Sequence, residues 1–142
     1  MNLDQVYRQV VMDHYKNKRN FYEMDEYTHI IHYKNPTCGD VMTMFANIEN
    51  DHMKELSFIG EGCSISMATS SMFTEVVKNK SLEEVLEISD LFEQMIMSWS
   101  KIEDERLMDL ISLEGVHSLP ARYNCALMPF QAFSNLILEK GD

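Results

Sequence analysis

The spacing of apolar residues changes along the chain, and this change constrains the fold more than any other feature. Between residues 41 and 48 the alternate positions are apolar, which is the period of a β-strand with one buried face. From residue 65 onward the apolar residues recur three or four positions apart, which is the period of a helix. The sequence therefore predicts a sheet in the first half of the chain and helices in the second.

Three β-rich runs follow one another with short links, and an amphipathic helix over Leu3–Tyr15 precedes them. The predicted strands are Thr28–Tyr33, Val41–Ile48 and Met53–Ile59. Short links between consecutive strands favour an antiparallel meander. We therefore predict an α+β fold: a three-stranded antiparallel sheet with helices packed mainly on one face, in a single domain covering residues 1–142.

The second half of the chain carries several helix signals. Apolar spacing predicts a helix over 65–76, and the capping box formed by Ser81 and Glu84 begins another that extends to Trp99. A shorter helix is expected around residues 107–111, closing near Gly115. Residues 118–120 begin a further helical region, in which Pro129 predicts either a kink or the start of a new helix.

Composition excludes several classes of function. A formal net charge of −11 argues against a nucleic-acid partner, because phosphate binding needs a basic face. No apolar run reaches the roughly 18 residues that a membrane span needs. The polar amino terminus lacks the features of a secretory signal, and an odd number of cysteines argues against a disulfide framework. We therefore expect a cytoplasmic protein with reduced thiols and no membrane contact.

The three cysteines lie at predicted element boundaries. Cys38 falls in the link between the first two strands, two residues before Asp40, and Cys63 falls where the third strand gives way to a helix. Cys125 lies in the last helical region. Three thiols and one carboxylate complete the four ligands of a tetrahedral zinc ion. Their wide spacing matches no common zinc-finger pattern, however, so spacing alone favours small buried cysteines over a shared metal site, while the placement of all three at element boundaries keeps the metal site open.

Two local features favour thiolates at these positions. The predicted helix start at Cys63 offers unpaired amide donors and a positive partial charge, and Gly60 and Gly62 permit close approach of the backbone. Arg122 precedes Cys125 by about one helical turn, so its guanidinium is placed to favour a thiolate there.

Five motifs in chain order make the sequence similar to the IscU/NifU-N family of iron–sulfur cluster assembly proteins. The resemblance extends from Val6 to about Ala132. The motifs are Val11-Met12-Asp13-His14-Tyr15-Lys16-Asn17, Asn35-Pro36-Thr37-Cys38-Gly39-Asp40, Gly60-Glu61-Gly62-Cys63-Ser64-Ile65-Ser66, Ser71-Met72 and Pro120-Ala121-Arg122-Tyr123-Asn124-Cys125-Ala126.

Within this family the chain most resembles the SufU branch. Scaffolds of the IscU type carry a histidine just before the third cysteine, where this chain has Asn124. SufU-like members also have a helical insertion between the second and third cysteines, and residues 81–99 fit it. Residues 128–130 depart from the family pattern, which leaves the local helix geometry open.

The resemblance implies a zinc ion held by Cys38, Asp40, Cys63 and Cys125, with Arg122 offsetting the surplus negative charge of these ligands. It implies a sulfur acceptor, at most a zinc-dependent sulfurtransferase, that takes persulfide sulfur from a cysteine desulfurase. That partner is a pyridoxal-phosphate enzyme of the SufS type, and the sulfur passes on to the cluster assembly machinery. Cys38 is the expected acceptor, because a loop moves more freely than a helix.

Two alternatives use the same ligands. In the first, the protein is a scaffold that binds iron and assembles a [2Fe–2S] cluster for transfer; Asn124 in place of histidine counts against it. In the second, the zinc is purely structural and the protein acts by binding alone.

Overall fold

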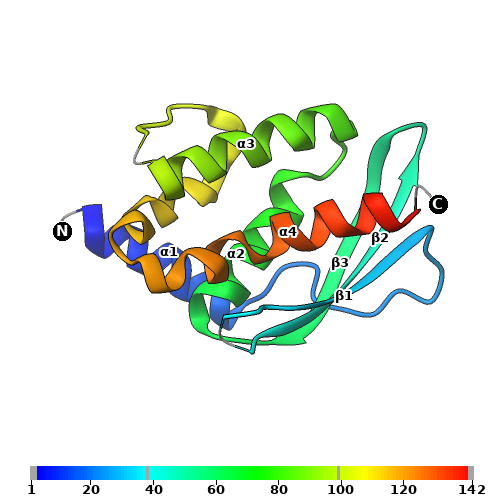
Figure 1. The fold of residues 1–142 in the computed structure, drawn as a ribbon, viewed down its shortest axis with the longest axis horizontal. Helices are drawn as coiled ribbons and strands as arrows, with labels where there is room; N and C mark the ends of the chain where they lie inside the picture. Colours follow the sequence, from blue (N-terminus) through cyan, green and yellow to red (C-terminus); the bar gives the residue numbers. More distant parts are fainter. Residues whose placement is uncertain (1–2, 38, 99, 141–142) are drawn as a thin grey trace.

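Three consecutive strands form an antiparallel sheet in the order β1–β2–β3 (Figure 1). The computed structural model describes residues 3–37, 39–98 and 100–140. The strands are β1 (His29–Lys34), β2 (Val41–Glu49) and β3 (His52–Glu61). They confirm the predicted meander, with ends that differ from the expected ones by at most two residues.

The register places one apolar face of the sheet against the core. Met44 of β2 pairs with Phe58 of β3 and Ile31 of β1, and all three side chains are buried. The β2–β3 hairpin turns at Asn50 and Asp51, whose φ angles are 51° and 61°. Asn and Asp tolerate this left-handed conformation, which two-residue hairpins need to match the twist of their strands.

The helices lie mainly on one face of the sheet (Figure 1). They are α1 (Leu3–Lys16), α2 (Ser64–Val76), α3 (Leu82–Ser98), the 3₁₀ segments η1 (Glu105–Ser118) and η2 (Pro120–Arg122), and α4 (Tyr123–Lys140). The α2 helix is buried around most of its circumference, because it packs against α1, α4, η1 and β3. None of the described helices is long and apolar enough to cross a membrane.

Two contacts fix α4 over the sheet and over α2. The Tyr33 hydroxyl of β1 donates to Oε1 of Gln131 at 2.6 Å, and burial raises the pKa of this tyrosine. Inside the core, the Thr69 hydroxyl of α2 donates to the carbonyl of Ala126 at 3.0 Å. The first turns of α4 are therefore held at fixed positions relative to both β1 and α2.

The second half of the chain differs in detail from the sequence-based expectation. The short helix expected at 107–111 is a longer 3₁₀ segment, interrupted at Met108 where φ is 48° and ψ is −127°. The alternative of a new helix starting at Pro129 is wrong, because α4 runs through this residue. Proline removes only one N–H donor, and the buried residues on both sides keep the helix packed. The expected end of α3 at Trp99 falls outside the described residues.

Candidate metal centre

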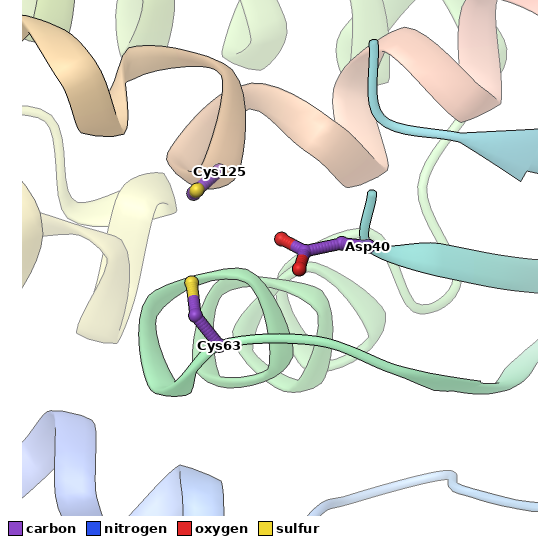
Figure 2. A group of neighbouring side chains, drawn as sticks. All are labelled: Asp40, Cys63 and Cys125. Carbon is purple, nitrogen blue, oxygen red and sulfur yellow. The ribbon is translucent and has the colours of Figure 1, made fainter. Parts of the chain in front are cut away.

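Three of the four predicted ligands come together at one end of the sheet. The carboxylate of Asp40 and the sulfur atoms of Cys63 and Cys125 all lie within 4.8 Å of one another (Figure 2). They come from the start of β2, the start of α2 and the first turn of α4. The fourth predicted ligand, Cys38, lies outside the described residues.

Cys63 is the N-cap of α2 and takes the place that a serine or aspartate often fills. Its Sγ accepts a hydrogen bond from the backbone N–H of Ser66 at 3.4 Å, and its carbonyl accepts from the Ser66 hydroxyl at 3.0 Å. An amide donor and the positive end of a helix dipole both stabilise negative charge on sulfur. The sulfur therefore lies at the start of a helix, where the sequence predicted it.

Gly62 lets the strand end, the helix start and the carboxylate meet. A Cβ at this position would lie 2.4 Å from Oγ of Ser66 and 2.9 Å from Cγ of Asp40, which are separations that real Cβ atoms do not show. Gly60 plays a related part on β3: its φ is 151°, and a Cβ there would lie 2.2 Å from the carbonyl oxygen of Val41. Gly60 is needed because backbone approaches it closely, and Gly62 is needed because the side chains of Ser66 and Asp40 fill the space beside it.

Asp40 ends a loop that is folded on Asn35. The backbone N–H of Asn35 donates to the carbonyl of Asp40 at 2.7 Å, and Gly39 donates back to the carbonyl of Asn35 at 3.2 Å. Gly39 adopts a φ of 73°, which favours glycine at this turn. The Asp40 residue is only 7% exposed, so its carboxylate is held near the two sulfur atoms.

Cys125 is fully buried in the first turn of α4. Its neighbour Asn124 donates through Nδ2 to the hydroxyl of Thr37, in the loop between β1 and β2. The sequence did not single out Thr37, and no local pattern points to this contact because the two residues lie 87 positions apart. Arg122 is exposed in η2, and its expected role as a compensating cation stays a prediction.

The donor set fits a zinc ion. Zinc takes thiolates at about 2.3 Å and carboxylate oxygens at about 2.0–2.2 Å, so the ligand atoms of a tetrahedral site lie roughly 3.4–3.8 Å apart. Atoms already within 4.8 Å of one another need only small inward shifts to reach that geometry. Two sulfur atoms and one oxygen leave one position of a tetrahedron for a further ligand.

His14 does not belong to this cluster and has a structural environment of its own. It is 2% exposed, its Nδ1 lies 2.8 Å from Oγ of Ser71, and its Nε2 lies 2.8 Å from Oδ2 of Asp109. These contacts join α1, α2 and η1. Among the residues that the structure describes, the group with metal-ligand geometry contains no histidine.

The fold and the cluster together define a small sheet-and-helix domain with a sulfur-rich group of side chains, able to hold a metal ion, at the end of its sheet. The chain belongs to the family of NifU-like N-terminal domains, whose sequence pattern matches residues 6–126. This confirms the family expected from the five motifs.

Two known relatives match nearly the whole chain. The chain is 41% identical over 140 residues to a zinc-dependent sulfurtransferase SufU of Bacillus subtilis, covering 99% of this chain and 91% of the relative. It is 33% identical over 135 residues to an iron–sulfur cluster assembly scaffold protein IscU of Streptococcus pyogenes, covering 95% and 84%. The crystal structure of a NifU-like protein from Brucella abortus has the same fold, with a TM-score of 0.88 at 18% identity and coverage of 97% and 96%.

Proposed function

We propose that this protein serves iron–sulfur cluster assembly as a zinc-bound acceptor of sulfur from a cysteine desulfurase. The observation that carries the proposal is the convergence of the Asp40 carboxylate with the sulfur atoms of Cys63 and Cys125 within 4.8 Å. Cys38 is the fourth ligand in this proposal. The name of the Bacillus subtilis relative, a zinc-dependent sulfurtransferase, supports this function over nearly the full chain.

Cys38 is the proposed acceptor because the other two thiols are held in the fold. The Cys63 sulfur is engaged by the Ser66 amide at the start of α2, and Cys125 is fully buried. A bound zinc ion would supply positive charge that keeps the coordinating thiols deprotonated. In our proposal the acceptor is therefore Cys38, the loop residue between the strands.

The transfer itself is a thiol–disulfide-type exchange. The Cys38 thiolate attacks the terminal sulfur of the desulfurase persulfide, and a new sulfur–sulfur bond forms on this chain. The bond between that sulfur and the desulfurase cysteine breaks, and the latter leaves as a thiolate. Sulfur moves without net oxidation or reduction, and Cys38 becomes a persulfide that the cluster assembly machinery can consume.

The proposed partner is a pyridoxal-phosphate desulfurase of the SufS type, working with this protein in the cytoplasm. The net charge of −11 would steer the chain toward a basic patch on such a partner. Nucleic acid remains excluded from the proposal on the same ground of charge.

Transfer of labelled sulfur tests the proposal. The zinc-loaded chain is incubated with a cysteine desulfurase and ³⁵S-cysteine, and protein-bound label is measured without reductant. We expect label on the wild type and its loss in Cys38→Ala, while Ser134→Ala, an exposed change on α4, keeps it. A Cys38→Ala protein that accepts label as well as the wild type would refute the assignment of Cys38.

The alternative of a [2Fe–2S] scaffold is favoured by the names of the IscU relatives and by the oxygen ligand Asp40. Metal analysis of protein purified without added iron separates the two functions. About one zinc per chain supports the sulfur acceptor, whereas iron with equivalent acid-labile sulfide supports the scaffold. If zinc is bound but desulfurase turnover does not change on addition of the chain, the zinc is purely structural.

A further inference from the structure

Asn35 directly follows β1 and lies opposite Asp40, one of the proposed metal ligands. Its backbone N–H donates to the carbonyl of Asp40 at 2.7 Å, which continues the antiparallel register of β1 and β2 by one pair beyond Lys34 and Val41. Residues directly opposite each other in an antiparallel pair carry their side chains on the same face. The side chains of Asn35 and Asp40 are therefore neighbours.

Both side chains belong to the face of the sheet that the helices cover. Asn35 is 1% exposed and Asp40 is 7% exposed, whereas Lys34 and Val41, the next pair in the register, are exposed to solvent. The Asp40 carboxylate extends from this face toward the two sulfur atoms of the metal centre (Figure 2). Asn35 is thus a buried polar residue beside a proposed ligand.

The two ends of the Asn35 amide have unequal partners. Oδ1 accepts a hydrogen bond from the Thr37 backbone N–H at 3.0 Å, which identifies the other end of the amide as the NH₂ group. This Nδ2 atom is buried and has no hydrogen-bond partner among the residues that the structure describes. An unpaired buried donor destabilises a fold, and those that proteins keep often serve a bound ion or a functional state.

A metal ligand next to this donor supplies a reason for it. A carboxylate that binds a metal through one oxygen keeps a second oxygen that accepts hydrogen bonds. Such hydrogen bonds fix the orientation of the ligand, and their donors contribute to metal affinity. An NH₂ group offers a metal no lone pair, so Nδ2 of Asn35 can act on a ligand but not on the ion itself.

We propose that Asn35 is a positioning residue that donates through Nδ2 to the carboxylate of Asp40 when a metal ion is bound. The inference rests on the proposed function, because it takes Asp40 as a ligand of that ion. The bond between Oδ1 and the Thr37 N–H holds the amide in place, and Nδ2 keeps the carboxylate turned toward the ion. The bond to Asp40 belongs to the metal-bound protein, so its loss weakens zinc binding more than it weakens the metal-free fold.

The zinc affinity of Asn35 variants tests this inference. Competition with a chromophoric chelator measures the affinity, and urea unfolding of the metal-free protein measures the stability of the fold. We expect Asn35→Ala to bind zinc about 10- to 100-fold more weakly, with little change in the urea midpoint. Asn35→Ser keeps an oxygen that can accept from the Thr37 N–H but lacks the amide donor. It should therefore keep the loop and still bind zinc more weakly.

Two further variants show whether Asn35 acts through Asp40. In an Asp40→Ala background, Asn35→Ala should cost no further zinc affinity, because the acceptor of the proposed bond is gone. Ser57→Ala is the matched control: Oγ of Ser57 is also buried without a partner in the described part of the chain, but Ser57 pairs with Phe45 in the middle of the sheet. This variant should bind zinc as the wild type does.

The outcomes separate this inference from the proposed function. Wild-type zinc affinity in both Asn35→Ala and Asn35→Ser overturns the inference alone. An equal loss of affinity with and without the Asp40 carboxylate also overturns it, as does a fall in metal-free stability large enough to explain the weaker binding. A wild type that binds zinc with the expected dependence on Asn35 but accepts no labelled sulfur contradicts the proposed function alone. A wild type that binds no zinc contradicts both.

Discussion

Gly62 determines how closely the carboxylate of Asp40 approaches the start of α2. The space that a Cβ would need is taken by Oγ of Ser66 and by the side chain of Asp40. The Ser66 hydroxyl donates a hydrogen bond to the carbonyl of Cys63, and Asp40 is a proposed ligand. Any side chain at position 62 must therefore displace part of the metal centre.

We predict that Gly62→Ala weakens zinc binding at least about tenfold. A Cβ 2.9 Å from Cγ of Asp40 forces the carboxylate away from the two sulfur atoms, and displaced ligands lower metal affinity. Competition with a chromophoric chelator measures the change. Gly115→Ala is the matched control, because a Cβ there meets nothing within 4 Å. Equal zinc affinity in Gly62→Ala and wild type would contradict the proposed placement of the metal.

The places of Cys63 and Asp40 in the fold could be predicted from the sequence better than the contacts around them. Cys63 and Asp40 lie beside turn and helix-start signals that act over a few residues, and so their positions could be argued locally. The bond from Asn124 to Thr37 depends on how α4 docks onto the sheet. No spacing rule contains that information, because it arises from tertiary packing alone.

Among the elements, α3 and η1 are connected by a small charged cluster. Asp104 is the N-cap of η1 and accepts from the backbone N–H of Arg106 at 2.9 Å. The Arg106 guanidinium also contacts Asp104 at 2.9 Å and Glu87 of α3 at 3.0 Å. The hydrogen bonds that Arg106 donates to Asp104 lower the pKa of Asp104 to about 2. Those from the Arg106 side chain have the largest effect, followed by the one from its backbone N–H.

This pKa shift predicts a pH dependence of folding stability. A carboxyl group whose pKa is lower in the folded state stabilises the fold above its ordinary value of 3.8, and this contribution is lost as the pH falls toward 2. We expect Asp104→Asn to lower the free energy of unfolding of the metal-free protein near pH 6. The difference in this free energy between wild type and variant should shrink toward pH 2. Urea midpoints across that range measure it.

A double variant identifies the source of this pH dependence. In an Arg106→Gln background, the loss of stability caused by Asp104→Asn should depend less on pH, because the guanidinium that lowers the pKa of Asp104 most is gone and only the backbone N–H of residue 106 remains. If the difference in urea midpoint between wild type and Asp104→Asn grew as the pH falls, the lowered pKa of Asp104 could not be its cause.

Helix type was harder to predict than helix position. The segment after α3 was expected to be helical, and η1 is a 3₁₀ segment broken at Met108. Asp109, the next residue, lies 2.8 Å from the buried ring of His14, which fixes η1 against α1 and α2. This tertiary contact competes with regular helix geometry, and apolar spacing carries no sign of it.

At the scale of the whole molecule, the metal centre joins parts of the chain that fold locally. Asp40 directly precedes β2, Cys63 is the N-cap of α2 and Cys125 lies in α4, so one ion would connect the sheet to two of its covering helices. Such a site is not formed in the unfolded chain, and binding free energy therefore adds to folding free energy.

We therefore predict that zinc raises the melting temperature well above that of chelator-treated protein. At free zinc about 1,000-fold above its dissociation constant the stabilisation is about 4 kcal/mol. For a chain of 142 residues this corresponds to roughly 8–16 °C. Differential scanning calorimetry with and without chelator measures this difference in melting temperature. Asp40→Asn, which keeps the shape of the side chain but removes its charge, should make the difference smaller. Equal melting temperatures with and without chelator would show that the cluster of Asp40, Cys63 and Cys125 holds no stabilising metal.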